Sequence, residues 1–147
     1  GLSNKGFVFY TNFNSKKGSD LKSNQVASMC FHWKSLRRQV RVIGEVEKVS
    51  DKEADEYYQS RAYGSKIAAW ASSQSQPMQS RDIFLKKLGE YKKKYSDENK
   101  VPRPPHWSGW RIIPKEIEFW LDGENRVHER LNYILKNKIW SKEILYP

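Results

Sequence analysis

Apolar and polar residues alternate towards both ends of the chain, whereas the middle shows helical spacing. Residues 6–12 (GFVFYTN) place aromatic and β-branched residues between turn formers, which predicts a strand. Residues 26–33 and 38–49 predict two more strands, and Gly44 interrupts the second of these, which indicates a bulge or a bend. A short helix is expected at about residues 19–24.

Three helices are predicted in the middle of the chain. Ser50 and Glu53 form the S-x-x-E pattern of a capping box, so a helix should cover about residues 51–61. Ser65 is expected to cap a second helix and Ser80 a third. The third helix has apolar residues at i, i+4, i+7 and i+11, which form one stripe: Phe84, Leu88, Tyr91 and Tyr95.

The last third of the chain predicts strands again. The strand-like segments are residues 110–114, 117–121, 126–135 and 139–146. Asp122 and Gly123 form a strong signal for a tight hairpin between two of these segments. In a strand, Arg126, His128 and Arg130 would leave from one face as a cationic column, whereas a helix would separate His128 from the two arginines. The hairpin signal favours the strand.

About six strands with helices inserted between them predict a mainly β fold with inserted helices (α+β), built as an antiparallel barrel. A chain of 147 residues suits one domain, residues 1–147. The proline-rich segment 98–107 is expected to be an extended loop. No apolar run approaches the roughly 20 residues that a membrane-spanning helix requires.

Charge narrows the classes of ligand. The net charge is +10, which favours polyanions or phosphorylated molecules as partners. Much of this charge lies in residues 86–95 (KKLGEYKKKY), where it is expected to form a solvated helix face. The single cysteine, Cys30, excludes an internal disulfide and suits a reducing compartment, so a cytoplasmic location is expected. Cys30 itself is expected to be a small buried residue of its strand.

Several kinds of catalytic site are not indicated. The three histidines are scattered, and no cysteine or histidine pair has metal-ligand spacing, so no metal site is expected. The sequence also has no G-x-S-x-G, Walker A or G-x-G-x-x-G motif. A nucleotide would therefore have to be held by side chains and strand ends.

Two groups of polar residues could hold phosphate. Just past the first strand, backbone N–H groups and nearby hydroxyl and ammonium groups could grip an anion, although an exposed basic turn would have the same sequence. This first group consists of Thr11, Ser15, Lys16 and Lys17. In the second group, Tyr57 and Arg61 are i, i+4 neighbours on the capped helix, and Ser65 begins the next helix, whose N-terminus favours an anion. Taken singly, each of these residues is more often part of the surface or the core.

Seven segments together resemble the pyridoxamine 5′-phosphate oxidase family, in the family's order and over nearly the whole chain. They are FVFYTN, SKKG, RQVRVIGEVEKV, YYQSRAYGSKIAAWASSQS, VPRPPHWSGWRI, IEFWLDGENRVHERL and the closing LYP. The resemblance implies an FMN-binding split antiparallel β-barrel that forms a homodimer with FMN at the subunit interface. It also implies oxidation of pyridoxine 5′-phosphate or pyridoxamine 5′-phosphate to pyridoxal 5′-phosphate, a reaction of vitamin B6 metabolism. The substrate C4′ carbon would deliver a hydride to FMN, and O2 would take the electrons and yield H2O2.

The resemblance also assigns roles to residues. The positions implied to contact FMN are Tyr10, Thr11, Lys16, Lys17, Gln39, Gln74, Ser75, Trp120 and Arg130. Tyr57, Arg61 and Ser65 match positions that hold the substrate phosphate. Arg126 and His128 match the pair that closes over the pyridine ring, and we expect them to be the catalytic residues. The phosphates of FMN and substrate would neutralise the cationic column.

The chain departs from the family pattern at several places. Lys16 replaces the usual Arg, so an ammonium group stands where a planar guanidinium could bind a phosphate through two donors. Glu129 replaces the usual Asp, and LYP replaces LAP at the end. In the family, a strand upstream of Gly1 supplies an Arg and a Lys to the phosphates, so we expect that an N-terminal segment precedes this sequence.

Two alternatives remain open at this point. A split-barrel protein could bind FMN or pyridoxal 5′-phosphate without oxidising a substrate, and peroxide production separates it from the enzyme. A basic barrel could bind nucleic acid through its charge and aromatic residues, and it would be colourless and bind oligonucleotides with a steep dependence on salt.

Overall fold

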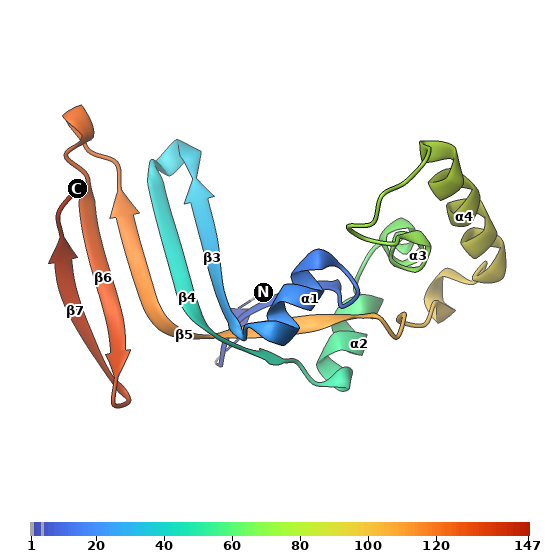
Figure 1. Ribbon diagram of the computed structural model, residues 1–147, viewed down its shortest axis with the longest axis horizontal. Helices are drawn as coiled ribbons and strands as arrows, with labels where there is room; N and C mark the ends of the chain where they lie inside the picture. The colour runs from blue at the N-terminus through green and yellow to red at the C-terminus, as the bar shows by residue number, and fades with distance from the viewer. Residues whose placement is uncertain (1, 4) are drawn as a thin grey trace. The chain divides into compact units, whose positions relative to one another are not determined.

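The computed structural model describes residues 2, 3 and 5–147, and Figure 1 shows the order of their helices and strands. The strands are β1 Leu2–Ser3, β2 Gly6–Asn12, β3 Val26–Trp33, β4 Arg38–Lys48, β5 Trp107–Leu121, β6 Glu129–Lys136 and β7 Ile139–Leu145. The α-helices are α1 Lys16–Ser23, α2 Asp51–Gln59, α3 Tyr63–Ala71 and α4 Arg81–Lys94. Three short 3-10 turns cover Lys34–Leu36, Glu98–Lys100 and Glu124–Arg126.

The chain forms two compact units. The first unit contains the chain up to Val8 together with Gln25–Glu47 and Arg111–Pro147, and the second contains Phe9–Asn24 and Lys48–Trp110. Strands β2, β4 and β5 run from one unit into the other. The predicted division of the chain into terminal strands and central helices is confirmed.

An antiparallel sheet forms the first unit. Its order is β1-β2-β5-β4-β3, and β6 pairs with both β5 and β7. The predicted antiparallel pairing of β5 with β6 is confirmed, with Trp120 opposite Arg130 and Leu121 opposite Glu129, but residues 122–128 connect them in place of the predicted tight turn. The prediction of separate strands at 110–114 and 117–121 is wrong, because β5 runs without a break through Pro114. The fixed φ of proline is compatible with extended backbone, so Pro114 does not end the strand.

Gly44 has a different role from the one predicted. The pairing of β3 with β4 passes through Gly44 opposite Ala27 with no extra residue, so there is no bulge on this side. A Cβ atom at Gly44 would collide with the carbonyl oxygen of Ile113 on β5. The glycine therefore permits the close approach of two backbones rather than a change of register.

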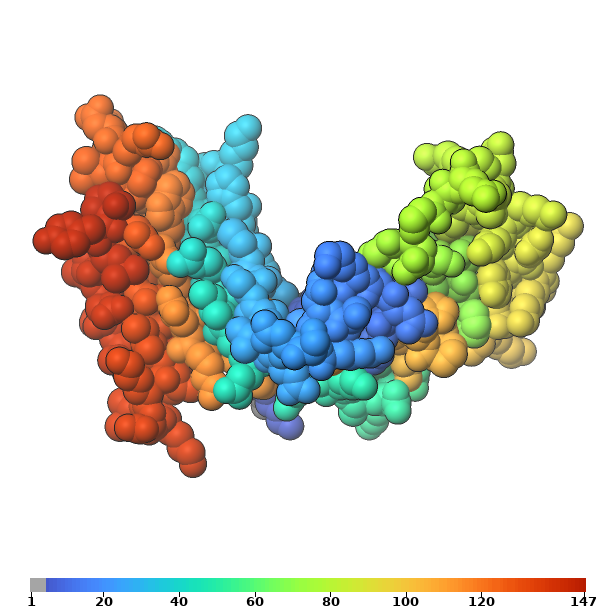
Figure 2. All heavy atoms as spheres, viewed as in Figure 1, coloured from blue at the N-terminus to red at the C-terminus, as the bar shows by residue number. Residues whose placement is uncertain are grey.

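Helices and a small aromatic core form the second unit. Tyr58, Ile67, Val101 and Trp107 are buried together, and α4 packs against them through its predicted stripe, of which Leu88, Tyr91 and Tyr95 contact the core. Phe84 of the same stripe is half-buried, and the lysines of α4 are exposed as predicted. Figure 2 shows α3 and α4, in green to yellow, packed side by side.

The predicted helix starts are only partly correct. Ser50 caps α2 by accepting a hydrogen bond from the N–H of Glu53 at 3.2 Å, as expected, but α2 ends at Gln59. Ser65 does not cap α3, because the N-cap residue is Ala62 and Ser65 lies in the first turn. Helix α1 begins at Lys16, earlier than predicted, because the Ser15 side chain accepts from the N–H of Gly18 and caps it.

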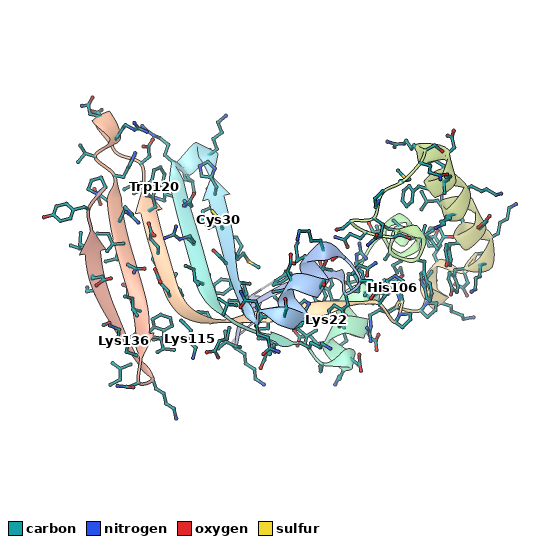
Figure 3. All side chains as sticks on the ribbon, in the orientation of Figure 1. Lys22, Cys30, His106, Lys115, Trp120 and Lys136 are labelled. Carbon is teal, nitrogen blue, oxygen red and sulfur yellow. The ribbon has the colours of Figure 1, made fainter. Side chains whose placement is uncertain are left out.

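Cys30 is exposed, so the prediction that it is buried is wrong. Figure 3 labels Cys30 on β3. Residues two apart on a strand share a face, and Ser28 and His32, on either side of Cys30 on that face, are exposed too. Over the residues that the structure describes, none of the helices is long and apolar enough to cross a membrane.

Candidate functional site

A groove of about 1170 Å³ lies at one end of the sheet in the first unit. Its walls come from the β3–β4 turn, the start of β4, the end of β5, the β5–β6 connection, the start of β6 and the C-terminal residues. Four residues predicted to belong to the site line it: Gln39, Trp120, His128 and Arg130. Trp120 is labelled near the end of β5 in Figure 3. Much of the remaining lining is apolar, and includes Trp33, Leu36, Phe119, Val127, Leu131 and Ile144.

A buried carboxylate holds Arg130 in place. Glu118 is 4% exposed and accepts from Arg130 Nε at 2.8 Å and from Arg41 Nη2 at 2.6 Å. Arg130 Nη1 also donates to the carbonyl oxygen of Tyr146 at 3.0 Å. The hydrogen bond from Arg130, assisted by the charge of Arg41, holds the pKa of Glu118 below its usual value, and Glu118 in turn raises the pKa of Arg130. Glu118 is therefore ionised and fixes the direction of the Arg130 guanidinium.

The predicted cationic column does not exist. Strand β6 begins only at Glu129, so Arg126 and His128 lie in the seven-residue connection 122–128 and not on a strand. Arg126 ends a 3-10 turn, and both it and Asn125 have left-handed φ values, 66° and 53°. The backbone therefore folds back on itself instead of forming a two-residue hairpin turn, and a Cβ atom at Gly123 would collide with the carbonyl oxygen of Val127. The Arg126 side chain is exposed.

His128 is fixed from two sides. Its ring lies 4.8 Å from that of Trp120, measured between centroids. Its Nδ1 atom is 3.2 Å from the N–H of Gly123 and 3.1 Å from Asp122 Oδ1. Asp122 in turn binds Arg37, which lies in the β3–β4 turn.

In the second unit, polar groups gather where β2 ends. Thr11 and Asn12 are buried, and the Asn12 backbone N–H donates to Gln74 Oε1 at 3.2 Å. Asn12 Oδ1 accepts from the N–H of Asn14 at 2.7 Å, which turns the chain towards the Ser15 cap of α1. The structure thus brings Thr11 and Gln74 to one place, although they are far apart in the sequence.

The other predicted FMN contacts of this unit lie on α1 and after α3. Lys16 is exposed and pairs with Asp20 at 3.5 Å, and Lys17 Nζ lies 5.8 Å from the centre of the Phe9 ring. Ser75 follows Gln74 in the loop after α3 and has a left-handed φ of 68°. Neither residue of this loop was singled out by spacing, and only the resemblance pointed to them.

An aromatic stack organises the predicted substrate-phosphate residues. Tyr10 and Tyr57 stack with ring centres 3.8 Å apart, and Tyr10 also stacks with Trp107 at 5.3 Å. The Arg61 guanidinium lies 4.8 Å from the centre of the Trp107 ring. Arg61 lies just past the end of α2, so the i, i+4 helix geometry predicted for it is wrong, and Ser65 is exposed in the first turn of α3.

Two buried polar atoms of these residues have no hydrogen-bond partner among the described residues. They are Thr11 Oγ1 and Arg61 Nη1. A buried donor without a partner is costly, and it often marks a site for a ligand or water. The described part of the chain has no group of three or more His, Cys, Asp or Glu residues that could hold a metal ion.

Sequence reasoning missed the carboxylates of this site. Glu118 binds Arg41, which lies 77 residues away along the chain, and Asp122 binds Arg37, which lies 85 residues away. Glu118 carried one available signal, because a charged residue within the IEFWL strand needs a partner if its face is buried. Asp122 carried none, since it had already been explained as a turn residue.

Comparison with known proteins identifies the family. The profile described as pyridoxamine 5′-phosphate oxidase matches residues 3–95, and that of the pyridoxine 5′-phosphate oxidase C-terminal dimerisation region matches residues 107–147. The pyridoxine/pyridoxamine 5′-phosphate oxidase of Pelagibacter ubique (strain HTCC1062) is 63% identical over 143 residues, which cover 97% of this chain and 69% of that protein. The enzyme of the same name from Allorhizobium ampelinum is 55% identical over 144 residues, covering 97% and 69%.

Solved structures agree on the fold. PhzG from Burkholderia lata 383, in complex with tetrahydrophenazine-1-carboxylic acid, matches with a TM-score of 0.90 and 27% identity, over 100% of this chain and 71% of that one. A pyridoxamine 5′-phosphate oxidase-related, FMN binding protein from Nostoc punctiforme PCC 73102 matches with a TM-score of 0.76 and 15% identity, over 100% and 77%, and supports the fold alone. The predicted split β-barrel architecture is confirmed. The chain belongs to the pyridoxamine 5′-phosphate oxidase family.

Proposed function

We propose that this protein is an FMN-dependent oxidase that converts pyridoxine 5′-phosphate or pyridoxamine 5′-phosphate to pyridoxal 5′-phosphate. The observation that carries the proposal is the groove of the first unit, where Gln39, Trp120 and His128 from three separate segments line one cavity. The relatives that are 55–63% identical carry the name of this activity.

The residues present fit FMN and a phosphorylated substrate. A phosphate group carries about −1.5 to −2 charges near neutral pH and accepts several hydrogen bonds. Thr11 Oγ1 and Arg61 Nη1 are buried and have no partner among the described residues, so each can donate to such a group. Lys16 and Lys17 add two ammonium groups close to Thr11 in the chain.

Each side chain would have a definite task. Bound FMN would supply the redox chemistry, taking a hydride from the substrate C4′ carbon, with O2 as the final electron acceptor and H2O2 as the second product. Tyr57, Arg61 and Ser65 would hold the substrate phosphate. Arg126 and His128 would orient the pyridine ring, and His128 would accept a proton through an unprotonated ring nitrogen.

We further propose that the protein is a homodimer with FMN at the subunit interface. The residues that match the dimerisation region carry large apolar side chains that are exposed in the single chain, among them Phe119, Val127, Ile139 and Ile144. Exposed apolar groups in one region are typical of a surface that another protein covers.

A spectrum and a peroxide assay test the proposed function. The purified protein, supplied with FMN and freed of excess by gel filtration, should retain a flavin absorption band and should produce H2O2 when pyridoxine 5′-phosphate is added. A protein that retains no flavin would refute the proposal. A yellow protein that forms no peroxide with either substrate would instead support the flavin-binding protein without oxidase activity.

A further inference from the structure

Three residues from two loops form a chain of contacts that ends at His128. Arg37 closes the β3–β4 turn with a left-handed φ of 52°, and Asp122 begins the β5–β6 connection. Arg37 donates to Asp122 Oδ2 from Nε at 2.8 Å and from Nη2 at 2.6 Å. The other carboxylate oxygen, Oδ1, lies 3.1 Å from His128 Nδ1. The guanidinium thus occupies one oxygen and leaves the second for the imidazole.

The backbone supports the same arrangement. The N–H of Asp122 donates to the carbonyl oxygen of Arg37 at 3.0 Å, so the two loops are joined by main-chain as well as side-chain contacts. The Arg37 side chain is 62% exposed, and an ion pair at such a surface adds little to stability. The contribution of Arg37 is therefore geometric, since its planar fork fixes the orientation of the carboxylate.

His128 Nδ1 has two neighbours that require opposite protonation states. The N–H of Gly123, at 3.2 Å, can donate only to an Nδ1 atom that carries no proton, and a neutral ring would then carry its proton on Nε2. Asp122 Oδ1 can accept only from a protonated Nδ1, which leaves Nε2 of the neutral ring with a free lone pair. Because Nδ1 faces the loop, Nε2 is the nitrogen left for the groove that His128 lines. The partner of Nδ1 therefore decides whether Nε2 presents a proton donor or a proton acceptor to the groove.

We propose that Asp122, oriented by Arg37, is a positioning residue that selects the Nδ1–H tautomer of His128 and so presents Nε2 to the groove as a proton acceptor. An ionised carboxylate is a stronger partner than a neutral backbone N–H, because charge-assisted hydrogen bonds are about twice as strong as neutral ones. The catalytic consequence rests on the proposed function, in which His128 accepts a proton. The tautomer itself does not depend on the proposed function, because it is a property of the protein alone.

Nitrogen-15 NMR of histidine side chains tests this proposal directly. The full chain, labelled with 15N-histidine and loaded with FMN, is measured at about pH 8, where an ordinary imidazole is neutral. A His128→Gln variant identifies the His128 signals among those of the three histidines. We expect the wild-type ring to carry its proton on Nδ1, and the Asp122→Ala ring, left with the Gly123 N–H, to carry it on Nε2. Asp82→Asn, on the exposed first turn of α4, is the control and should leave the His128 signals unchanged.

The outcomes separate the two proposals. A wild-type His128 with its proton on Nε2 would overturn the inference without any variant, and so would the same tautomer in wild type and in Asp122→Ala. In steady-state assays, Asp122→Ala should lower kcat by about tenfold or more with little change in KM, because a general base in the wrong tautomer loses part of the roughly 10²–10⁴-fold that such a base contributes. A protein that shows the expected tautomers but oxidises no substrate would refute the proposed function and leave the role of Asp122 intact.

Discussion

Replacing Glu118 with Gln tests whether the buried carboxylate holds Arg130 in place. The substitution keeps the shape of the side chain but removes its charge, so that Arg41 and Arg130 would face a neutral amide. Breaking a fully buried ion pair by changing one partner destabilises a protein by about 3–5 kcal/mol. Here the carboxylate side chain is 5% exposed, but the Arg41 and Arg130 side chains are 42% and 27% exposed and can be solvated in part. We therefore expect a smaller loss, of about 2–3 kcal/mol, in the free energy of unfolding.

Urea unfolding followed by circular dichroism measures this loss. With a slope of about 2 kcal/mol per molar urea, the midpoint should fall by about 1 M. All variants are compared at one protein concentration, since the stability of an oligomer depends on it. Glu116→Gln is the matched control, because Glu116 lies on the same strand two residues earlier and is half-buried. It should change stability by less than about 0.5 kcal/mol. Equal midpoints for the two variants would refute the role assigned to Glu118.

The pH dependence gives a second check on the same carboxylate. The pKa of Glu118 is lowered in the folded protein, so its contribution is complete above the pKa of the unfolded chain and is lost as pH falls towards the folded value. The difference in stability between wild type and Glu118→Gln should therefore be constant from about pH 6 to 8 and shrink below about pH 4. A difference that stays constant at acid pH would contradict the ionised state of Glu118.

Three further predictions concern other parts of the chain. Tyr58→Phe should cost about 1–2 kcal/mol, because the buried hydroxyl donates to the Lys66 carbonyl oxygen at 2.8 Å. Burial raises the pKa of Tyr58 to about 12, so wild type should lose more stability than the variant as pH rises from 10 to 12 in alkaline unfolding curves. Gly44→Ala should lower the free energy of unfolding by about 1–3 kcal/mol, whereas Gly64→Ala, with no atom near the added methyl group, should not. Arg126→Leu should reduce turnover and leave FMN bound, and unchanged turnover would exclude a role for Arg126.

Local patterns were sufficient for much of the secondary structure. The segment 26–33 is a strand with the predicted bounds, and the stripe of α4 is the face that contacts the core. The predictions fail where a tertiary contact determines the local structure. Gly44 was interpreted as a bulge because the sequence does not show that the Ile113 backbone lies against it. Ser65 was interpreted as a cap because serine favours that position, but α3 starts at Tyr63.

The site was predictable as a set of residues but not as a geometry. Motif resemblance named Trp120, His128 and Arg130, and all three line the groove. The side chains that orient the last two, Asp122 and Glu118, could not be named in this way. Their partners lie on distant segments, and the pairing becomes visible only once β5 is placed between β4 and β6.

These pairings change the electrostatic picture of the site. The sequence suggested a bare cationic column that two phosphates would neutralise, but the protein itself supplies part of the counter-charge. Glu118 pairs with both Arg41 and Arg130, and Asp122 pairs with Arg37 and contacts His128, while much of the remaining groove wall is apolar. The apolar and aromatic side chains of this groove suit the face of an aromatic ring system.

Two residues predicted to belong to the site carry buried donors that lack a hydrogen-bond partner among the described residues. They are Arg61 Nη1 and Thr11 Oγ1, and both residues belong to the second unit. A phosphate would satisfy such donors, whereas an aromatic ring would leave them unpaired at a cost of about 1–3 kcal/mol each. The donors of Arg61 and Thr11 are therefore suited to a phosphate group. Replacing Arg61 should then weaken binding of a phosphorylated ligand far more than binding of its unphosphorylated form, whereas replacing Trp120 should weaken both alike.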